Sequence, residues 1–174
     1  MSQKPAVLVT GASTGLGAIY ADRFARRGHD LVLVARDAAR MEELAKRLRT
    51  EAGVKIDILQ ADLTKDVDLA KVETRLREDQ RIGILVNNAG VAAPGNFLQQ
   101  SGDELAKLIG LNVTALTRLA NAVAPRFAQA GEGAIINITS VVALAPELNL
   151  TVYGATKAFV LFLTQGLHLE LGPK

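Results

Sequence analysis

The sequence predicts an α/β fold, a doubly wound parallel sheet with helices on both faces. Short apolar segments rich in Val, Leu and Ile alternate with longer segments in which apolar residues recur at helical spacing. The first apolar segment is followed at once by a glycine-rich turn. Strands that alternate with helices form right-handed crossovers between parallel strands. The length of 174 residues suits a single domain spanning residues 1–174.

The first half of the chain supports this alternation element by element. Ala6–Val9 is a short apolar, β-branched run, and the helical pattern that follows the turn covers Gly15–Arg27. Asp30–Ala35 is continuously apolar, as expected of a parallel strand that is buried on both faces. A second helix is indicated around Met41–Leu48, and Lys55–Gln60 is predicted to be the third strand.

The second half continues the pattern. Leu69–Glu78 is predicted to be a helix and Ile82–Val86 the fourth strand. Three further elements complete the prediction: a helix Asp103–Ala128, a strand Ala134–Thr139 and a helix Val152–Leu171. Ser101 suits the cap of the long helix, and Pro125 should kink that helix because proline lacks a backbone N–H.

Composition excludes several classes of function. The chain has no Cys and two His, His29 and His168, so we expect no metal site and no disulfide. The net charge of +2 is spread along the chain, which argues against a nucleic-acid partner. No apolar segment reaches the roughly 18 residues of a membrane span. We therefore expect a cytoplasmic protein that binds neither a membrane nor a nucleic acid.

The glycine-rich turn Thr10–Gly17 is a candidate phosphate-binding loop. The helix begins inside it, so backbone N–H groups at a positive helix end would face a pyrophosphate. Its spacing differs from the strict G-x-G-x-x-G pattern, and a tight connection is the alternative reading. Its place after the first strand favours the dinucleotide reading. The residues expected to contact the cofactor are Gly11, Ser13, Thr14, Gly15, Leu16 and Gly17.

The end of the second strand favours NADP over NAD. An NAD site usually places a carboxylate there, on the ribose 2′-hydroxyl. Here Ala35 takes that position and Arg36 follows. A guanidinium can bind a 2′-phosphate through charge-assisted hydrogen bonds, although a solvated Arg36 beside Asp37 is the alternative.

Tyr153 and Lys157 are four residues apart, so both side chains lie on one face of the last helix. A phenol ordinarily has a pKa of about 10 and is a poor base at neutral pH, but a neighbouring cation stabilises phenolate. The pair alone is weak, because such spacing is usual on exposed helix faces.

Four motifs together resemble the short-chain dehydrogenase/reductase family: Thr10–Gly17, Asn87–Gly90, Ser140 thirteen residues before Tyr153, and Tyr153–Lys157. Each motif alone has a structural explanation, such as a turn or a cap. In family order they span nearly the whole chain. The resemblance implies a Rossmann-type three-layer α/β/α sandwich, of which five strands are visible here.

The resemblance also implies roles for individual residues. Tyr153 would exchange a proton with the carbonyl or hydroxyl oxygen, and Ser140 would orient that oxygen. Lys157 would hold the nicotinamide ribose, and Asn112 would hold a water that connects the lysine to solvent. The implied catalytic set is thus Asn112, Ser140, Tyr153 and Lys157. The further cofactor contacts implied are Asp62, Leu63, Asn88, Ala89 and Gly90, together with Tyr153 and Lys157.

The leading functional hypothesis is an NADP-dependent oxidoreductase acting on a small-molecule carbonyl or alcohol. The alternative is a dinucleotide-binding protein or fragment without turnover. Family members usually continue past the last helix, so we expect the chain to be C-terminally incomplete and Ala134–Thr139 to be an edge strand. A homodimer or homotetramer is implied by the last two helices, which could equally pack within one monomer. The residues expected to line an apolar substrate wall are Val91, Pro94, Val141, Val142 and Leu150.

Overall fold

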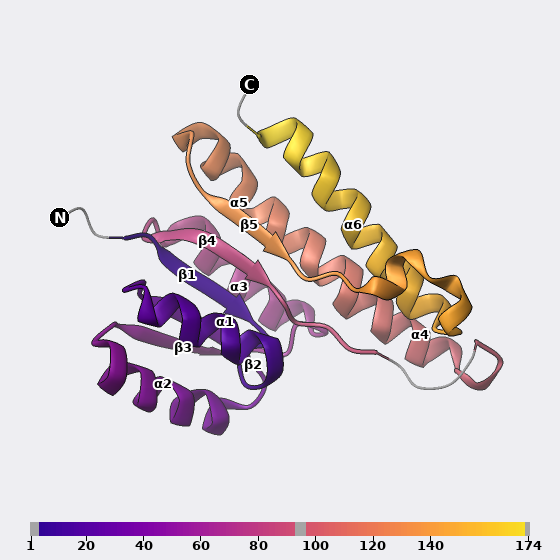
Figure 1. Cartoon of the computed structure of the whole chain (residues 1–174), viewed down its shortest axis with the longest axis horizontal. Helices are drawn as coiled ribbons and strands as arrows, with labels where there is room; N and C mark the ends of the chain where they lie inside the picture. Colours follow the sequence, from indigo (N-terminus) through magenta and orange to yellow (C-terminus); the bar gives the residue numbers. More distant parts are fainter. Residues whose placement is uncertain (1–3, 93–96, 173–174) are drawn as a thin grey trace.

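The computed structural model describes residues 4–92 and 97–172, and these form one five-stranded parallel sheet between helices (Figure 1). The strands follow the order β3-β2-β1-β4-β5 across the sheet. Their bounds are β1 Ala6–Thr10, β2 Leu31–Ala35, β3 Ile56–Gln60, β4 Ile82–Asn87 and β5 Ala134–Asn137. The doubly wound parallel sheet predicted from the sequence is confirmed.

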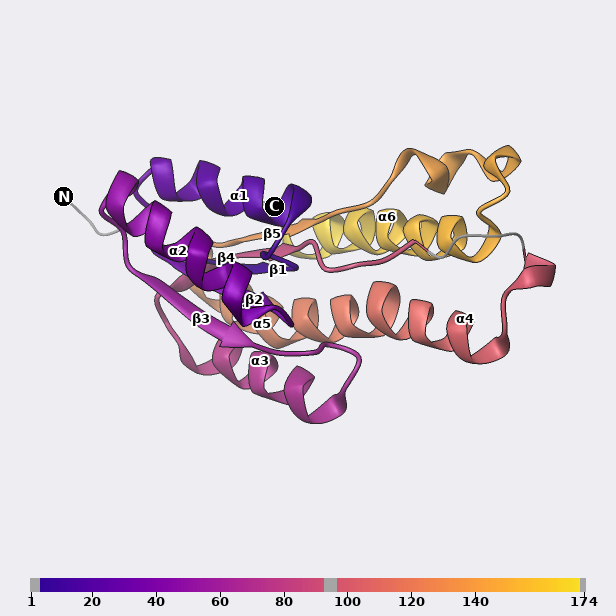
Figure 2. The ribbon, with the colours of Figure 1, turned by 90° about the horizontal axis from the view of Figure 1, so that it is seen from below.

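Helices cover both faces of the sheet (Figure 2). Their bounds are α1 Gly15–Arg26, α2 Ala38–Ala52, α3 Asp66–Glu78, α4 Gly102–Ile109, α5 Leu116–Ala130 and α6 Thr151–Leu171. Successive residues of β1 point to opposite faces: Val7 and Val9 pack with α1 and α2, whereas Leu8 packs with α3 and α5. The sheet is therefore the middle of three layers, with one apolar core on each side.

The helix predicted over Asp103–Ala128 is present, but it is not α-helical throughout. The chain forms α4, then a π-helical segment over Gly110–Ala115, and then α5, which continues past Pro125 to Ala130. A π segment accommodates an extra residue within a helix and is frequent at functional sites. Here the segment contains Asn112, which is buried and hydrogen-bonded to the loop after β4.

The helix start at Ser101 is confirmed in detail. The Ser101 side chain accepts from the Glu104 N–H at 3.3 Å, and the Glu104 carboxylate accepts from the Ser101 N–H at 2.8 Å. This reciprocal capping box satisfies backbone donors that the first helical turn would otherwise leave unpaired.

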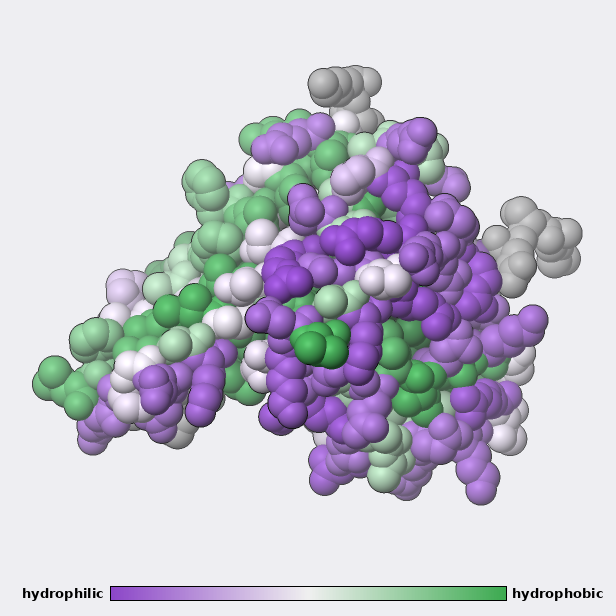
Figure 3. All heavy atoms as spheres, turned by 180° about the vertical axis from the view of Figure 1, so that it is seen from behind, coloured by the Kyte–Doolittle hydropathy of each residue, from purple (hydrophilic) through white to green (hydrophobic). Residues whose placement is uncertain are grey.

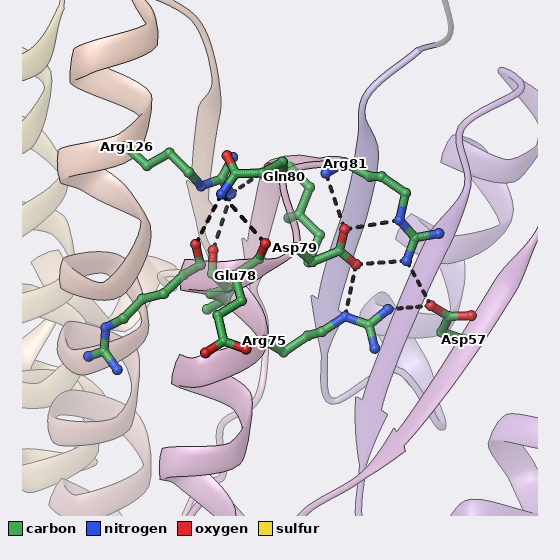
Figure 4. Close-up of polar contacts among 10 residues, drawn as sticks. Asp57, Arg75, Glu78, Asp79, Gln80, Arg81 and Arg126 are labelled. Carbon is green, nitrogen blue, oxygen red and sulfur yellow. Dashed lines mark hydrogen bonds and ion pairs between the residues drawn. The ribbon is translucent and has the colours of Figure 1, made fainter.

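The amino end of the sheet is fastened by an ion-pair network of four residues, Asp57, Arg75, Asp79 and Arg81 (Figure 4). Arg81 reaches Asp79 at 2.7 Å and Asp57 at 3.1 Å, and Arg75 contacts both carboxylates. Hydrogen bonds from Arg81 lower the pKa of Asp79 to about 2. The network joins β3, the end of α3 and the start of β4.

The carboxyl ends of β1 and β4 lie side by side at the centre of the sheet. From β1 the chain crosses to β2 on one side, and β4 is followed by β5 on the other. Such a switch in strand order opens a crevice in which α/β proteins bind ligands. No helix in the described part of the chain is long and apolar enough to cross a membrane.

Candidate active site

A cavity of about 780 Å³ opens at the carboxyl ends of the strands. Most of the predicted site residues line it, namely Gly11, Ser13, Thr14, Leu16, Arg36, Asp62, Leu63, Asn88, Ala89, Gly90, Ser140, Tyr153 and Lys157. Gly15, Gly17 and Asn112 do not line it; Gly17 and Asn112 are buried, and each contacts residues of the wall. The volume lies within the range of small-molecule and cofactor sites.

The glycine-rich loop needs glycine for two different reasons. Gly11 has φ +65° and Gly15 has φ +56°, a left-handed conformation that other residues rarely adopt. Gly17 is instead required by packing, since a Cβ there would lie 2.2 Å from the Gly11 carbonyl oxygen and 2.6 Å from Asn88 Nδ2. Gly17 thus lets α1 approach the loop.

Thr10 and Asn88 bind the loops after β1 and β4 together. The Thr10 hydroxyl donates to the Val86 carbonyl at 3.2 Å and accepts from the N–H groups of Asn88 and Ala89, each at 3.0 Å. Asn88 Nδ2 donates to the Thr10 carbonyl at 2.9 Å. The sequence places Thr10 in the glycine-rich loop but does not predict these contacts, although its position at the end of a buried strand is a signal for them.

The N-terminus of α1 differs from those of α2 and α4. Asp37 caps α2 by accepting from the Arg40 N–H at 3.0 Å, and Ser101 caps α4. Thr14, the residue that precedes α1, makes no side-chain cap, and the first turn of α1 contains no acidic residue. The backbone N–H groups of this turn are therefore available to an anion.

One part of the cavity wall contains both positively and negatively charged side chains. Arg36 is exposed and lines the cavity beside Asp37, Arg40 and Asp62. The Thr64 hydroxyl donates to Asp62 at 2.7 Å, and this bond, aided by Arg36 and despite partial burial, lowers the pKa of Asp62. Asp62 is thus held as a carboxylate, and Arg36 presents an exposed positive charge at the cavity wall.

Tyr153 and Lys157 lie on the first turns of α6, where both line the cavity. Lys157 Nζ is 5.8 Å from the centre of the Tyr153 ring and donates to the Ile138 carbonyl at 2.8 Å. The Thr139 hydroxyl donates to the Lys157 carbonyl at 2.8 Å. Lys157 is buried, which lowers its pKa. An ammonium has three donors, so two remain for a ligand.

Asn112 acts on the loop after β4 through its side-chain amide. Its Oδ1 accepts from the Val91 N–H at 2.9 Å, and its Nδ2 donates to the Val91 carbonyl at 2.8 Å and to the Thr156 hydroxyl at 3.2 Å. Both amide protons are thereby used. A Cβ on Gly90 would lie 3.1 Å from this Oδ1, so the loop passes close to the amide.

Comparison with known proteins identifies the family. The family model described as short chain dehydrogenase matches residues 5–174. The chain belongs to the short-chain dehydrogenase family.

Relatives within this family are similar along the whole chain. The rat protein named very-long-chain 3-oxoacyl-CoA reductase is 34% identical and covers 96% of this chain, which matches 54% of that protein. A human protein named 17-beta-hydroxysteroid dehydrogenase type 3 is also 34% identical, with the same coverage of both chains. The chain thus spans about half the length of the curated relatives it matches.

Two solved short-chain dehydrogenase structures are more similar. The bulky-bulky ketone specific alcohol dehydrogenase from Comamonas testosteroni has a TM-score of 0.97 and 64% identity; the match covers 99% of this chain and 69% of that one. The short-chain dehydrogenase from Sphingobium yanoikuyae, in complex with NADPH, has a TM-score of 0.96 and 67% identity, covering 97% and 66%.

The residues expected to face the substrate are divided between the cavity wall and the structure around it. Ser140 lines the cavity and caps a short 3₁₀ segment by accepting from the Val142 N–H at 3.4 Å. Of the residues expected to form an apolar wall, Val91 lines the cavity, whereas Val141, Val142 and Leu150 do not. Pro94 lies outside the described residues. Among those that are described, no cluster of three His, Asp or Glu side chains could hold a metal ion.

Proposed function

We propose that the protein is an NADP-dependent oxidoreductase that transfers a hydride between the nicotinamide and a carbonyl or alcohol carbon. One observation carries this proposal: a single cavity is lined by the glycine loop at one part of its wall and by Ser140, Tyr153 and Lys157 at another. A cofactor bound along it would bring its nicotinamide to the Tyr153 side. This arrangement supports turnover rather than nucleotide binding alone.

The residues present fit a dinucleotide phosphate. The uncapped first turn of α1 suits the pyrophosphate, since its N–H groups and the helix dipole favour negative charge. Asp62 and Leu63 suit the adenine, and Arg36 suits a 2′-phosphate. The NADPH complex of the Sphingobium relative supports the choice of NADP over NAD.

When bound, the nicotinamide supplies or accepts the hydride. In reduction Tyr153 donates its phenolic proton to the carbonyl oxygen, and in oxidation it accepts the hydroxyl proton. Ser140 donates a hydrogen bond to the same oxygen and so stabilises the charge that develops there. The two remaining N–H donors of Lys157 would hold the ribose of the cofactor, and its positive charge would stabilise the phenolate.

We propose a bulky, apolar ketone or the corresponding secondary alcohol as the substrate class. The Comamonas relative, named for bulky-bulky ketones, is 64% identical over nearly all of this chain. The relatives named for steroids and for 3-oxoacyl thioesters, at 34% identity, make these the competing classes.

The proposal also includes self-association and a cytoplasmic location. Apolar side chains gather along the flank formed by α5 and α6 (Figure 3), where Phe159, Phe162 and Leu169 are exposed. Such a patch suits an interface with a second copy. Light scattering of the purified protein should give a dimer or tetramer mass; a monomer would overturn this part.

The first experiment is a fluorescence titration with NADPH and NADH, followed by an assay of NADPH consumption with a diaryl ketone, a steroid ketone and a 3-oxoacyl thioester. We expect tighter binding of NADPH than of NADH and the fastest turnover with the diaryl ketone. Binding of NADPH without consumption on any ketone would favour a nucleotide-binding protein and would contradict the proposed enzyme.

A further inference from the structure

We propose that Thr156 is a positioning residue that holds the Tyr153 turn of α6 in register with the cofactor-binding loop. This inference rests on the proposed function of Tyr153, since it concerns the same site. Thr156 does not line the cavity, and it is buried. Its contribution is therefore made through its contacts and not through a ligand.

The Thr156 hydroxyl acts both as a hydrogen-bond donor and as an acceptor. It donates to the Tyr153 carbonyl at 2.7 Å and accepts from Asn112 Nδ2 at 3.2 Å. In a buried position, a hydroxyl with both roles filled fixes its neighbours more strongly than an exposed one, because water cannot replace either bond. The carbonyl of Tyr153 is thus connected to the amide of Asn112 through this one hydroxyl.

Asn112 extends this connection to the cofactor side. Its side chain is hydrogen-bonded to both the backbone N–H and the backbone carbonyl of Val91. Val91 follows the Asn88–Gly90 segment directly and lines the cavity. Three segments far apart in the sequence therefore meet: the loop after β4, the π segment, and the first turn of α6. A shift of the α6 turn would require Asn112 to lose a partner.

A second threonine in the same helix makes two bonds of the same kind, with other partners, and lies away from the site. The Thr164 hydroxyl donates to the Val160 carbonyl at 2.7 Å and accepts from Asn137 Nδ2 at 3.0 Å. Thr164 is eight residues after Thr156 and does not line the cavity. Thr164 therefore serves as a control. It distinguishes an effect on the position of Tyr153 from the general stabilisation that a threonine can give to a helix.

The test compares Thr156→Val with Thr164→Val, because valine keeps the shape of threonine and removes the hydroxyl. We expect Thr156→Val to lower kcat about ten- to a hundred-fold, the range for a small misplacement of a reacting group. The NADPH dissociation constant should stay within about two-fold in both variants, since neither side chain lines the cavity. Thr164→Val should have the kcat of the unmodified protein. Thr156→Ser, which keeps the hydroxyl, should turn over faster than Thr156→Val and close to the unmodified protein.

A second readout needs no activity. The sequence has two tyrosines, Tyr20 and Tyr153, so protein labelled with ¹³C at tyrosine Cζ gives two resonances, assigned with Tyr20→Phe. We expect Thr156→Val, or Thr156→Ala if the valine variant does not fold, to displace the Tyr153 resonance. Thr164→Val should leave the Tyr153 resonance in place.

The two proposals fail separately. Absence of turnover in the unmodified protein would contradict the proposed function, while the Tyr153 resonance would still decide the role of Thr156. A Tyr153 resonance that is unmoved in folded Thr156→Val and Thr156→Ala, or moved equally by Thr164→Val, would overturn the positioning role.

Discussion

The two ends of the sheet use polar groups in opposite ways. At the amino end, Asp57, Arg75, Asp79 and Arg81 pair with one another, and no charge is left for a ligand within this group. At the carboxyl end, the first turn of α1 carries no side-chain cap, and Arg36 is exposed at the cavity. One end satisfies its polar groups internally, and the other leaves them available.

This difference predicts that substitutions at the two ends act on different properties. Removing a polar side chain that lines the cavity at the carboxyl end should affect cofactor binding and turnover, whereas a change that disturbs the packing of the glycine-rich loop there should also affect stability. Changes at the amino end should affect stability alone. Four substitutions test this division, in order of decreasing expected effect.

Tyr153→Phe should give the largest effect. The substitution removes the phenolic proton but keeps the ring beside Lys157, so turnover should fall by a factor of about 10² to 10⁴. NADPH binding should be retained. Steady-state kinetics and a fluorescence titration measure the two quantities; loss of binding together with turnover would show that the ring itself shapes the cavity.

Gly17→Ala tests the close approach between α1 and the loop. The added Cβ would overlap the Gly11 carbonyl and Asn88, so we expect a loss of about 2–3 kcal/mol in the free energy of unfolding, with weaker NADPH binding. Gly166→Ala is the control, because nothing lies within 4 Å of its Cβ in the described structure. The free energy of unfolding of that variant should rise by about 0.5–1 kcal/mol. Urea titrations compare them; equal changes would argue against the packing role.

Arg36→Ala should weaken the binding of NADPH by about 2 kcal/mol, since a charge-assisted contact to the 2′-phosphate is lost. The binding of NADH should be nearly unchanged. Arg27→Ala is the control from the amino end of the sheet, where its guanidinium donates to the Arg23 carbonyl. It should change neither affinity. Equal losses for both cofactors in Arg36→Ala, measured by fluorescence, would remove the reason to prefer NADP.

Asp79→Asn should reduce stability by about 1.5 kcal/mol at neutral pH, the scale of a hydrogen bond to a charged group, and leave the kinetics unchanged. The pKa of Asp79 is lowered to about 2 in the folded chain, so its carboxylate stabilises the fold above about pH 4. That contribution disappears as the pH falls from about 4 to 2.

Urea midpoints recorded across this pH range check the expectation for Asp79. The difference between the unmodified protein and Asp79→Asn should shrink toward low pH. Glu78→Gln, at the exposed neighbouring position, should follow the unmodified protein. A difference that is constant with pH would show that the asparagine acts through packing and not through charge.

Most of the fold could be predicted from local patterns. Each strand was placed within two residues at either end, because a strand buried on both faces is a continuous apolar run. The π segment was missed, since the spacing of Leu108, Leu111 and Ala115 fits an ordinary helix. What sets it apart is the bond from Asn112 to Val91, 21 residues earlier, which no local pattern reveals.

The predicted site residues meet largely as expected, but their connections were not foreseen. Tyr153 and Lys157 were placed on one helix face from their spacing, and both line the cavity. The buried Lys157 donates to the Ile138 carbonyl, 19 residues earlier, and Thr156 accepts from Asn112, 44 residues earlier. Long-range hydrogen bonds of this kind leave no periodic signal in a sequence.

The central position of β1 has a consequence for biosynthesis. β1 precedes the other strands in the chain, yet it lies in the middle of the sheet, between β2 and β4. Its pairing with β4 begins at Ile82, so a ribosome must add more than 70 residues after Ala6 before the second edge of β1 can be covered. Contacts between residues so distant in sequence form slowly. The nascent chain therefore exposes an apolar strand edge during synthesis, and this interval is when a chaperone would be needed most.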